Sequence, residues 1–351
     1  MIIDYLIVGQ GIAGTLLANA LLEKNKSILV IDNHYESSAS IIAAGLYNPV
    51  VFKRFVKSWM VDELLPFADE TYTGLEKKLN GTFYHKRNIY KVFASNEDGK
   101  LWVDKSENNK YMFSEKIKEY LSECISNSFG GGEVIKAGNL DVAIFLRLYR
   151  TFLKDNDLIK EEAFDYNELE ISDKEIVWKG IRAKKIIFCE GYKTINNPFF
   201  KWLPFKLTKG EMIIVKIENF NTEKIINKGV FILPLGENLF KVGATYEWND
   251  LTEKATEKGK SELIKKLKNI LNIPFEITGH LSGIRPTVSD RRPLIGLHPE
   301  HKNLVVFNGM GTKGVLLAPY FANQLACFLE NNIELHPEAN IERYYKKYKK
   351  T

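Results

Sequence analysis

The sequence predicts an α/β protein, α+β overall, in which a domain with a parallel sheet is joined to a second domain built on an antiparallel sheet. Three observations predict this fold class. The chain opens with an apolar strand, a glycine-rich turn and a helix, and a second unit of this kind stands near the C-terminus. Between the two units, three strand patterns follow one another without a helix, as is typical of an antiparallel sheet.

The opening unit carries a recognisable motif. An apolar strand at 5–8 is followed by G-x-G-x-x-G at Gly9, Gly11 and Gly14, then by a helix and a second strand ending at Asp32. In such a Rossmann-like unit the first glycine permits a tight turn and the second lets a pyrophosphate approach the backbone. The third lets the helix pack on the strand. The Asp32 carboxylate lies where it can accept hydrogen bonds from ribose hydroxyls, so the unit predicts a dinucleotide site for FAD or NAD.

The next elements are less specific. Small residues at 37–49 end in an Asn-Pro pair and either admit a flat ligand or simply pack tightly. Apolar residues at helical spacing predict one or two helices in 55–79, and aromatic and β-branched residues predict strands in 82–95. The three glycines at 130–132 predict a flexible turn before a strand at 133–137.

The second half returns to alternating elements. A helix is expected at 140–153 with Asn139 as its N-cap, and a strand at 186–188 runs toward Gly191. A turn at 293–296 precedes the last strand and glycine loop. Further strands are expected at 210–218, 230–234, 239–247 and 304–307, and further helices at 254–271 and 315–330.

Two glycine-lined helix N-termini, far apart in sequence, can converge on one ligand that has two ends. The alternation therefore implies a discontinuous division of the chain. Residues 1–81, 139–203 and 277–351 are expected to form the dinucleotide domain, and residues 82–138 and 204–276 the substrate domain.

Composition narrows the class of protein. With a net charge of +5 over 351 residues, the sequence does not show the concentrated basic charge that is expected of a nucleic-acid binder. The three cysteines are widely spaced, and no cysteine or histidine spacing suggests a metal site. No leader pattern and no apolar run of ~20 residues is present. A cytoplasmic protein without metal or membrane attachment is the expectation.

With these motifs in place, the chain resembles the D-amino-acid-oxidase superfamily of FAD-dependent amine oxidoreductases, and is similar to its glycine oxidase and sarcosine oxidase branches. The resemblance runs nearly end to end and is weakest over 52–136. It rests on VGQGIAG with Asp32, IIAAGLYNP, IIFCEGY, FILPLGENLFKVGAT, GIRPTVSDRRPLIG and NGMGTKGVLLAP.

The resemblance implies FAD as the cofactor and a set of residues that hold it. One group would bind the pyrophosphate and adenosine: Gly9, Gly11, Ile12, Ala13, Gly14, Asp32 and Asn33. A second group would surround the ribityl chain and flavin ring: Ala43, Ala44, Gly45, Gly191, Gly309, Met310, Gly311, Thr312, Lys313, Gly314 and Val315. No cysteine precedes the last motif, so FAD is expected to be noncovalent.

The resemblance also implies two catalytic residues. Arg285 matches an arginine that holds the substrate carboxylate, although it could instead pair with a structural acid such as Asp290. Lys313 falls where a lysine assists dioxygen, although it could be a surface lysine in a loop. Phe231 stands where the glycine oxidases have a tyrosine, so a hydroxyl donor is lost and glycine itself is a doubtful substrate.

The resulting hypothesis is oxidation of the C–N bond of a small amino acid or secondary amine carboxylate. A hydride passes to the flavin, the imine hydrolyses, and dioxygen or another acceptor takes the electrons. One alternative is FAD-dependent oxidation of a modified tRNA base, approached over Lys53, Arg54 and Lys57, which we expect on a helix. Another is a noncatalytic FAD-binding protein.

Overall fold

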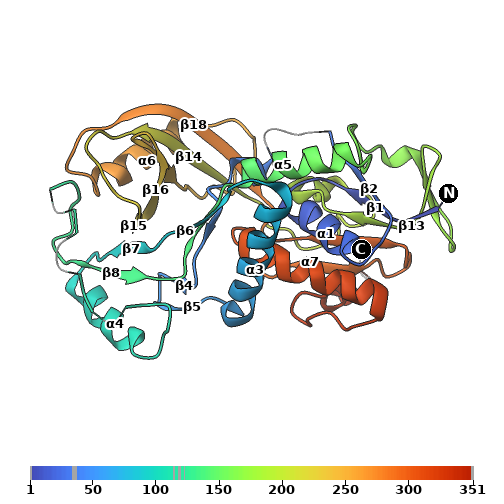
Figure 1. Cartoon of the computed structure of the whole chain (residues 1–351), viewed down its shortest axis with the longest axis horizontal. Coiled ribbons are helices and arrows are strands. Elements are labelled where there is room, and N and C mark those ends of the chain that lie inside the picture. Colours follow the sequence, from blue (N-terminus) through green and yellow to red (C-terminus); the bar gives the residue numbers. More distant parts are fainter. Residues whose placement is uncertain (1, 34–37, 114, 118–119, 122, 349–351) are drawn as a thin grey trace.

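The computed structural model describes the chain in two lobes (Figure 1). One lobe holds a mainly parallel sheet with α1 and α7, and the other holds a mainly antiparallel sheet with α6 on one side and α4 at one end. The described residues are 2–33, 38–113, 115–117, 120–121 and 123–348.

The parallel sheet places several strand ends in one row. Among the described residues it has eight strands, ordered β10-β2-β1-β13-β12-β11, with β20 beside β13 and β19 beside β20. Val8 of β1 is opposite Ile31 and Phe188, and Phe188 is opposite Val306. The loops after four strands therefore leave the sheet at one edge, where ligands bind in open α/β sheets. The strands are β1 (Ile2–Val8), β2 (Ile28–Ile31), β10 (Ile159–Lys160), β11 (Leu169–Ile171), β12 (Ile176–Trp178), β13 (Ile181–Phe188), β19 (Leu294–Leu297) and β20 (Leu304–Asn308).

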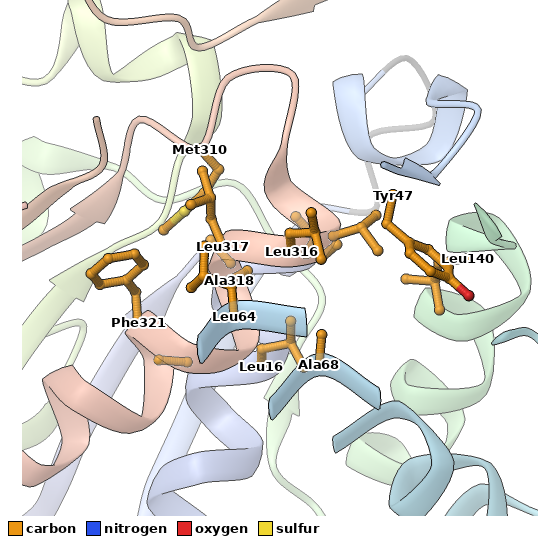
Figure 2. Packing of buried hydrophobic residues seen from close by; sticks show 14 of the residues in the cluster. Leu16, Tyr47, Leu64, Ala68, Leu140, Met310, Leu316, Leu317, Ala318 and Phe321 are labelled. Atoms are coloured by element: carbon orange, nitrogen blue, oxygen red, sulfur yellow. The ribbon is translucent and has the colours of Figure 1, made fainter. Parts of the chain in front are cut away.

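Apolar packing fixes the helices against this sheet. Helix α1 (Ile12–Leu22) is buried along nearly its whole length, because it packs on the sheet and against α7 (Gly314–Asn331), which in turn packs against α3 (Val61–Leu79). Figure 2 shows Leu16 of α1 close to Leu64 and Ala68 of α3, with Leu317 and Ala318 of α7 above them. A buried leucine stabilises the fold by roughly 1.5–3 kcal/mol, so this contact holds the N-termini of α1 and α7 in place.

The second sheet faces the lobe of the parallel sheet with one side only. Its seven described strands are ordered β18-β14-β17-β16-β15-β7-β8, and α6 (Glu257–Lys268) packs on one side with Leu263 and Leu267. On the opposite side, a Cβ atom at Gly283 would lie 3.4 Å from the Ile42 side chain. That side therefore adjoins segment 39–45. The strands are β7 (Ile89–Val92), β8 (Gly131–Val134), β14 (Thr208–Lys216), β15 (Ile225–Lys228), β16 (Val230–Gly236), β17 (Leu239–Gly243) and β18 (Glu276–Arg285).

Short elements connect the two sheets. Strands β3 (Leu46–Tyr47), β9 (Gly138–Leu140) and β6 (Tyr84–Lys86) form a small sheet, and β4 (Val50–Val51) and β5 (Val56–Lys57) form a hairpin. The remaining helices are α2 (Ala39–Ile42), α4 (Asn96–Ser106), α5 (Val142–Asp155) and α8 (Tyr345–Tyr348), with short 3₁₀ turns η1 (Tyr166–Glu168), η2 (Gly191–Asn196) and η3 (Ile341–Tyr344).

Four local expectations were wrong. The glycines at 131–132 begin β8, because a Cβ atom at Gly132 would lie 2.1 Å from the Trp102 ring that covers it. Asp141, not Asn139, caps α5, accepting from the Ile144 amide at 3.0 Å. The segment expected as a turn at 293–296 contributes to β19. Lys53 and Arg54 lie in the turn of the β4–β5 hairpin, not on a helix.

The expected division into domains cuts one strand. Residues 277–285 were assigned to the dinucleotide domain, but they belong to β18, which pairs with β14 along its length. The domain boundaries otherwise stay a prediction.

Candidate active site

The first glycine turn is closed by backbone on two sides and open on a third. Gly9 has φ +101°, and a Cβ atom there would lie 2.6 Å from the carbonyl oxygen of Cys189. A Cβ atom at Gly14 would lie 1.9 Å from the carbonyl oxygen of Gly9. A Cβ atom at Gly11 would meet only the Ser40 side chain. On the Gly11 side the turn is bounded by this one side chain and not by backbone, so a ligand would have to approach the turn from there.

Helix α1 begins at this open side without a side-chain cap. The Ile12 amide donates to the Ser40 hydroxyl at 3.2 Å. Amides of the first helical turn have no partner within their own helix, and they face an anion favourably together with the helix dipole. The turn thus fits a pyrophosphate group.

Asp32 is held at the end of β2 by two donors. Its Oδ2 accepts from the Gln10 amide at 2.8 Å, and its Oδ1 accepts from the Arg150 guanidinium at 2.8 Å. Arg150 is buried and also pairs with Glu161. Sequence reasoning missed Arg150, although an arginine within the apolar helix pattern at 140–153 was a usable signal. These two contacts fix the carboxylate at the carboxyl end of β2, the edge at which a ribose would bind in an open α/β sheet.

The C-terminal glycine loop lies against the first turn. A Cβ atom at Gly314 would be 3.3 Å from the Ile12 side chain, so the N-termini of α1 and α7 are neighbours. Asn308 joins this loop to the one after β13, because its amide donates to the Gly191 carbonyl at 2.8 Å and to the Thr194 hydroxyl at 2.6 Å. The role of Asn308 as a connector was not predicted from the sequence.

Segment 43–45 lies between the two lobes. Gly45 has φ +66°, and a Cβ atom there would lie 1.8 Å from the Leu140 carbonyl oxygen. The Lys241 ammonium of β17 donates to the Ala43 carbonyl at 3.4 Å. Burial lowers the pKa of Lys241, which Asp141 partly offsets. Sequence reasoning missed Lys241, a lysine inside the apolar strand pattern LFKVG.

Arg285 ends β18 and has no acidic partner among the residues that the structure describes. Its Nη1 lies 3.5 Å from the Lys209 carbonyl and 3.4 Å from the Thr245 carbonyl, both long contacts. Burial lowers the pKa of Arg285. The alternative pairing with Asp290 is not seen, because that carboxylate accepts from Arg343 at 3.1 Å and from a tyrosine hydroxyl.

Two contacts place Arg285 beside the glycine loops. Gly283, two residues before it on the same face of the strand, adjoins α2. Two residues after it, the Thr287 methyl group would lie 3.4 Å from a Cβ atom at Gly311. A Cβ atom at Gly210 would overlap the guanidinium, so glycine at this position makes room for it. The guanidinium therefore lies near the edge at which the parallel strands end.

Lys313 is not a surface lysine. It is half-buried, and its ammonium donates to the Ser58 hydroxyl at 2.9 Å. Burial lowers its pKa, and the charges of Arg292 and Arg291 lower it further.

The other residues expected around the flavin differ in exposure. Met310 and Val315 are buried, and the Val315 carbonyl accepts from the Tyr72 hydroxyl at 2.9 Å. Thr312 and Asn33 are exposed.

Across the described ranges, no helix is long and apolar enough to span a bilayer, and no group of three or more potential metal-binding side chains gathers.

Known proteins are similar in sequence to this chain over nearly its whole length. The glycine oxidase of Bacillus licheniformis is 22% identical over 94% of this chain and 93% of its own. A tRNA 5-methylaminomethyl-2-thiouridine biosynthesis bifunctional protein of Marinobacter nauticus is 21% identical over 91% of this chain, but only 54% of its own.

Solved structures show the same fold. The glycine oxidase of Geobacillus kaustophilus superimposes with a TM-score of 0.79 at 19% identity and 95% coverage of both chains. The iminodiacetate oxidase of Chelativorans sp. BNC1 gives a TM-score of 0.77 at 18% identity, covering 97% of this chain and 98% of its own. The model of the family described as FAD dependent oxidoreductase matches residues 4–327, and the chain belongs to that family.

Proposed function

We propose that this FAD-dependent oxidoreductase oxidises the C–N bond of a small amino acid or a secondary amine that carries a carboxylate. The observation that carries the proposal is the Arg285 guanidinium, which is half-buried without an acidic partner among the described residues. A buried charge without a partner is costly. A substrate carboxylate would supply that partner through two parallel hydrogen bonds.

The residues at the edge of the parallel sheet would hold FAD without a covalent bond. Gly9, Gly11, Ile12, Ala13 and Gly14 would bind the pyrophosphate, and Asp32 the adenosine ribose, with Asn33 beside it. The flavin end would lie among the residues of three segments: Ala43, Ala44 and Gly45; Gly191; and Gly309, Met310, Gly311, Thr312, Lys313, Gly314 and Val315.

FAD, when bound, supplies the hydride acceptor and passes the electrons on to dioxygen or another acceptor. Arg285 would orient the substrate by its carboxylate and so fix the direction of the carbon–hydrogen bond next to the amine. Lys241 and Lys313 would place positive charge where negative charge develops. The oxidised product is an imine, which water hydrolyses to a carbonyl compound and ammonia when the substrate is a primary amine, or an amine when it is a secondary amine.

Anaerobic bleaching of the flavin colour tests the proposal. A panel of amino acids and N-alkyl glycines should include at least one that reduces the flavin. In Arg285→Ala the bleaching rate at low substrate should fall by ~100-fold, as expected for a lost charge-assisted pair. Arg182→Ala is the matched control, because Arg182 pairs with Glu175 on the surface of β13. Equal rates in Arg285→Ala and wild type would remove the assignment.

Oxidation of a modified tRNA base is the second candidate, and the relative from Marinobacter nauticus favours it. The basic residues offered for it support it weakly, since Lys57 pairs with Asp62 at 2.9 Å and only Lys53 and Arg54 project from the hairpin turn. Binding of tRNA that weakens steeply with salt would support this candidate.

A further inference from the structure

Two exposed aromatic rings stand next to the substrate arginine. The Tyr246 and Trp248 side chains are 55% and 53% exposed, and their rings lie 6.3 Å apart at an interplanar angle of 25°. The Tyr246 ring covers the Arg285 guanidinium, with 4.8 Å between the guanidinium carbon and the ring centroid. The pair therefore continues outward from the point at which a carboxylate would bind.

Main-chain pairing puts both rings on one side of the segment. The Glu247 amide donates to the Lys209 carbonyl at 3.0 Å, and the Lys209 amide donates back to the Glu247 carbonyl at 2.8 Å. An extended segment points alternate side chains to opposite faces. Tyr246 and Trp248 consequently share the face of Arg285, while Glu247 points away and pairs with Lys258.

Buried charges hold the segment in this position. The fully buried Lys209 ammonium pairs with Asp250 at 2.7 Å. Buried Glu211 accepts from the Thr256 amide at 2.9 Å and its hydroxyl at 2.8 Å. The Tyr192 hydroxyl of the other lobe also bonds to Glu253. The rings are thus presented by a fixed backbone, which lowers the entropy lost when a ligand stacks on them.

Single exposed aromatic residues are ordinary on a protein surface, and Phe113, at 50% exposure, is one such residue. Tyr246 and Trp248 differ because they adjoin each other, are parallel within 25°, and lead to a half-buried cation. Flat parallel rings offer a face on which a further planar ring can stack.

We propose that Tyr246 and Trp248 form a stacking platform for an aromatic or heteroaromatic ring of the substrate. The substrate is then an amine carboxylate that carries such a ring: its carboxylate binds Arg285 beneath Tyr246, and its ring extends outward over Trp248. This inference rests on the proposed function and narrows its substrate class.

Two substrates that differ only in the ring test the platform. N-Benzylglycine and sarcosine both present a secondary amine and a carboxylate. In anaerobic flavin reduction by the wild-type protein, the second-order rate constant should be at least tenfold higher for N-benzylglycine than for sarcosine. That preference should fall roughly tenfold in Trp248→Ala, as expected for a lost aromatic contact, and should be retained in Trp248→Phe. Phe113→Ala is the matched exposed-aromatic control and should keep the wild-type preference.

The outcomes separate the two proposals. Reduction by both amines without preference, or a preference that survives in Trp248→Ala, would overturn the platform and leave the proposed function standing. If neither amine reduces the flavin, perturbation of the flavin spectrum by benzoate and acetate measures carboxylate binding instead. Benzoate should bind at least tenfold more tightly than acetate and lose that advantage in Trp248→Ala. Equal affinities would overturn the platform. Thermal unfolding and flavin content verify that each variant is folded.

Discussion

Two arginines with opposite surroundings define the site at the scale of single residues. Arg150 is buried and has two carboxylate partners, Asp32 and Glu161, so its charge is compensated within the protein. Arg285 is half-buried, and within the described ranges its guanidinium contacts main-chain carbonyls and an aromatic ring but no carboxylate. The first arginine therefore positions the acid that would bind the cofactor, while the second is arranged to take an anion from outside the chain.

Lys241 gives a prediction about the flavin itself. If its ammonium lies beside the flavin ring, the Lys241→Met variant should shift the two-electron midpoint potential to more negative values by about 20 mV, since a loss of ~1 kcal/mol of charge stabilisation corresponds to this shift. The matched control is Lys91→Met, which removes another lysine of the same sheet whose pKa is also lowered by burial. A potential that is unchanged in Lys241→Met would place this lysine away from the ring. Potentiometric titration measures both.

His298 predicts a pH dependence of stability. Burial, with the neighbouring charges of His301 and Lys302, lowers the pKa of His298 from 6.5 to about 4. Its Nδ1 accepts from the amides of Glu300 and His301, which requires the unprotonated nitrogen. Between pH 6.5 and 4 the unfolded chain therefore binds more protons at this residue than the folded chain. Its contribution to stability is present above pH 6.5 and is lost as the pH falls toward 4.

The comparison of wild type with His298→Asn isolates this effect, because the asparagine oxygen can accept the same amides without titrating. The free energy of unfolding, measured in urea, should fall between pH 6.5 and 4 by about 2 kcal/mol more in wild type than in the variant. If the free energy of unfolding falls with pH by the same amount in the two proteins, His298 is not held neutral in the folded state.

At the scale of elements, the first glycine turn shows why a motif constrains sequence. Gly9→Ala would place a methyl group against the Cys189 carbonyl at a φ of +101°, and should destabilise the protein by more than about 2 kcal/mol and weaken FAD retention. Gly74→Ala is the control, because this exposed glycine of α3 has no atoms within 4 Å of the new methyl group. It should stabilise the protein by roughly 0.5–1 kcal/mol. Thermal unfolding measures the stability of the two variants, and flavin absorbance after gel filtration measures their FAD retention. Equal stability and equal FAD retention in the two variants would contradict the close backbone contact at Gly9.

Elements were predicted well where their signal is local. The helices α1, α6 and α7 and the strands β14, β16 and β20 lie close to their expected positions, because apolar spacing along the chain determines them. The glycines at 131–132 misled the prediction because a distant ring, Trp102, makes glycine necessary in a strand. The β19 strand was missed because its four residues are stabilised by pairing with β20, not by their own pattern.

The whole molecule brings together loops that are about 300 residues apart in sequence. The turn at 9–14 and the loop at 309–314 touch, and Asn308 ties the latter to Gly191. A ligand that contacts all these segments stabilises the folded state by mass action, by about 4 kcal/mol at a concentration of 1,000 times its dissociation constant.

Adding FAD to flavin-free protein should therefore raise the midpoint of thermal unfolding by several degrees. The same concentration of NAD should have little effect, because NAD carries a single nicotinamide ring in place of the three-ring flavin that would contact the C-terminal loop. An equal shift with both dinucleotides would contradict binding across the two loops. Differential scanning fluorimetry with a dye that does not overlap flavin emission measures the shift.

The sequence by itself determined the fold class and a dinucleotide site, because glycine turns, strand ends and helix starts are local patterns with a fixed spacing. The resemblance of its motifs to a known family added the FAD dependence. It also pointed to Arg285 and Lys313 as residues of interest. Only the tertiary structure decided that Arg285 has no acidic partner in the described part of the chain, that Lys241 contacts the Ala43 carbonyl, and that Tyr246 covers the guanidinium. These facts depend on pairing between β14, β17 and β18 and on the packing of one lobe against the other. Such contacts join residues distant in the chain and leave no periodic signal within it.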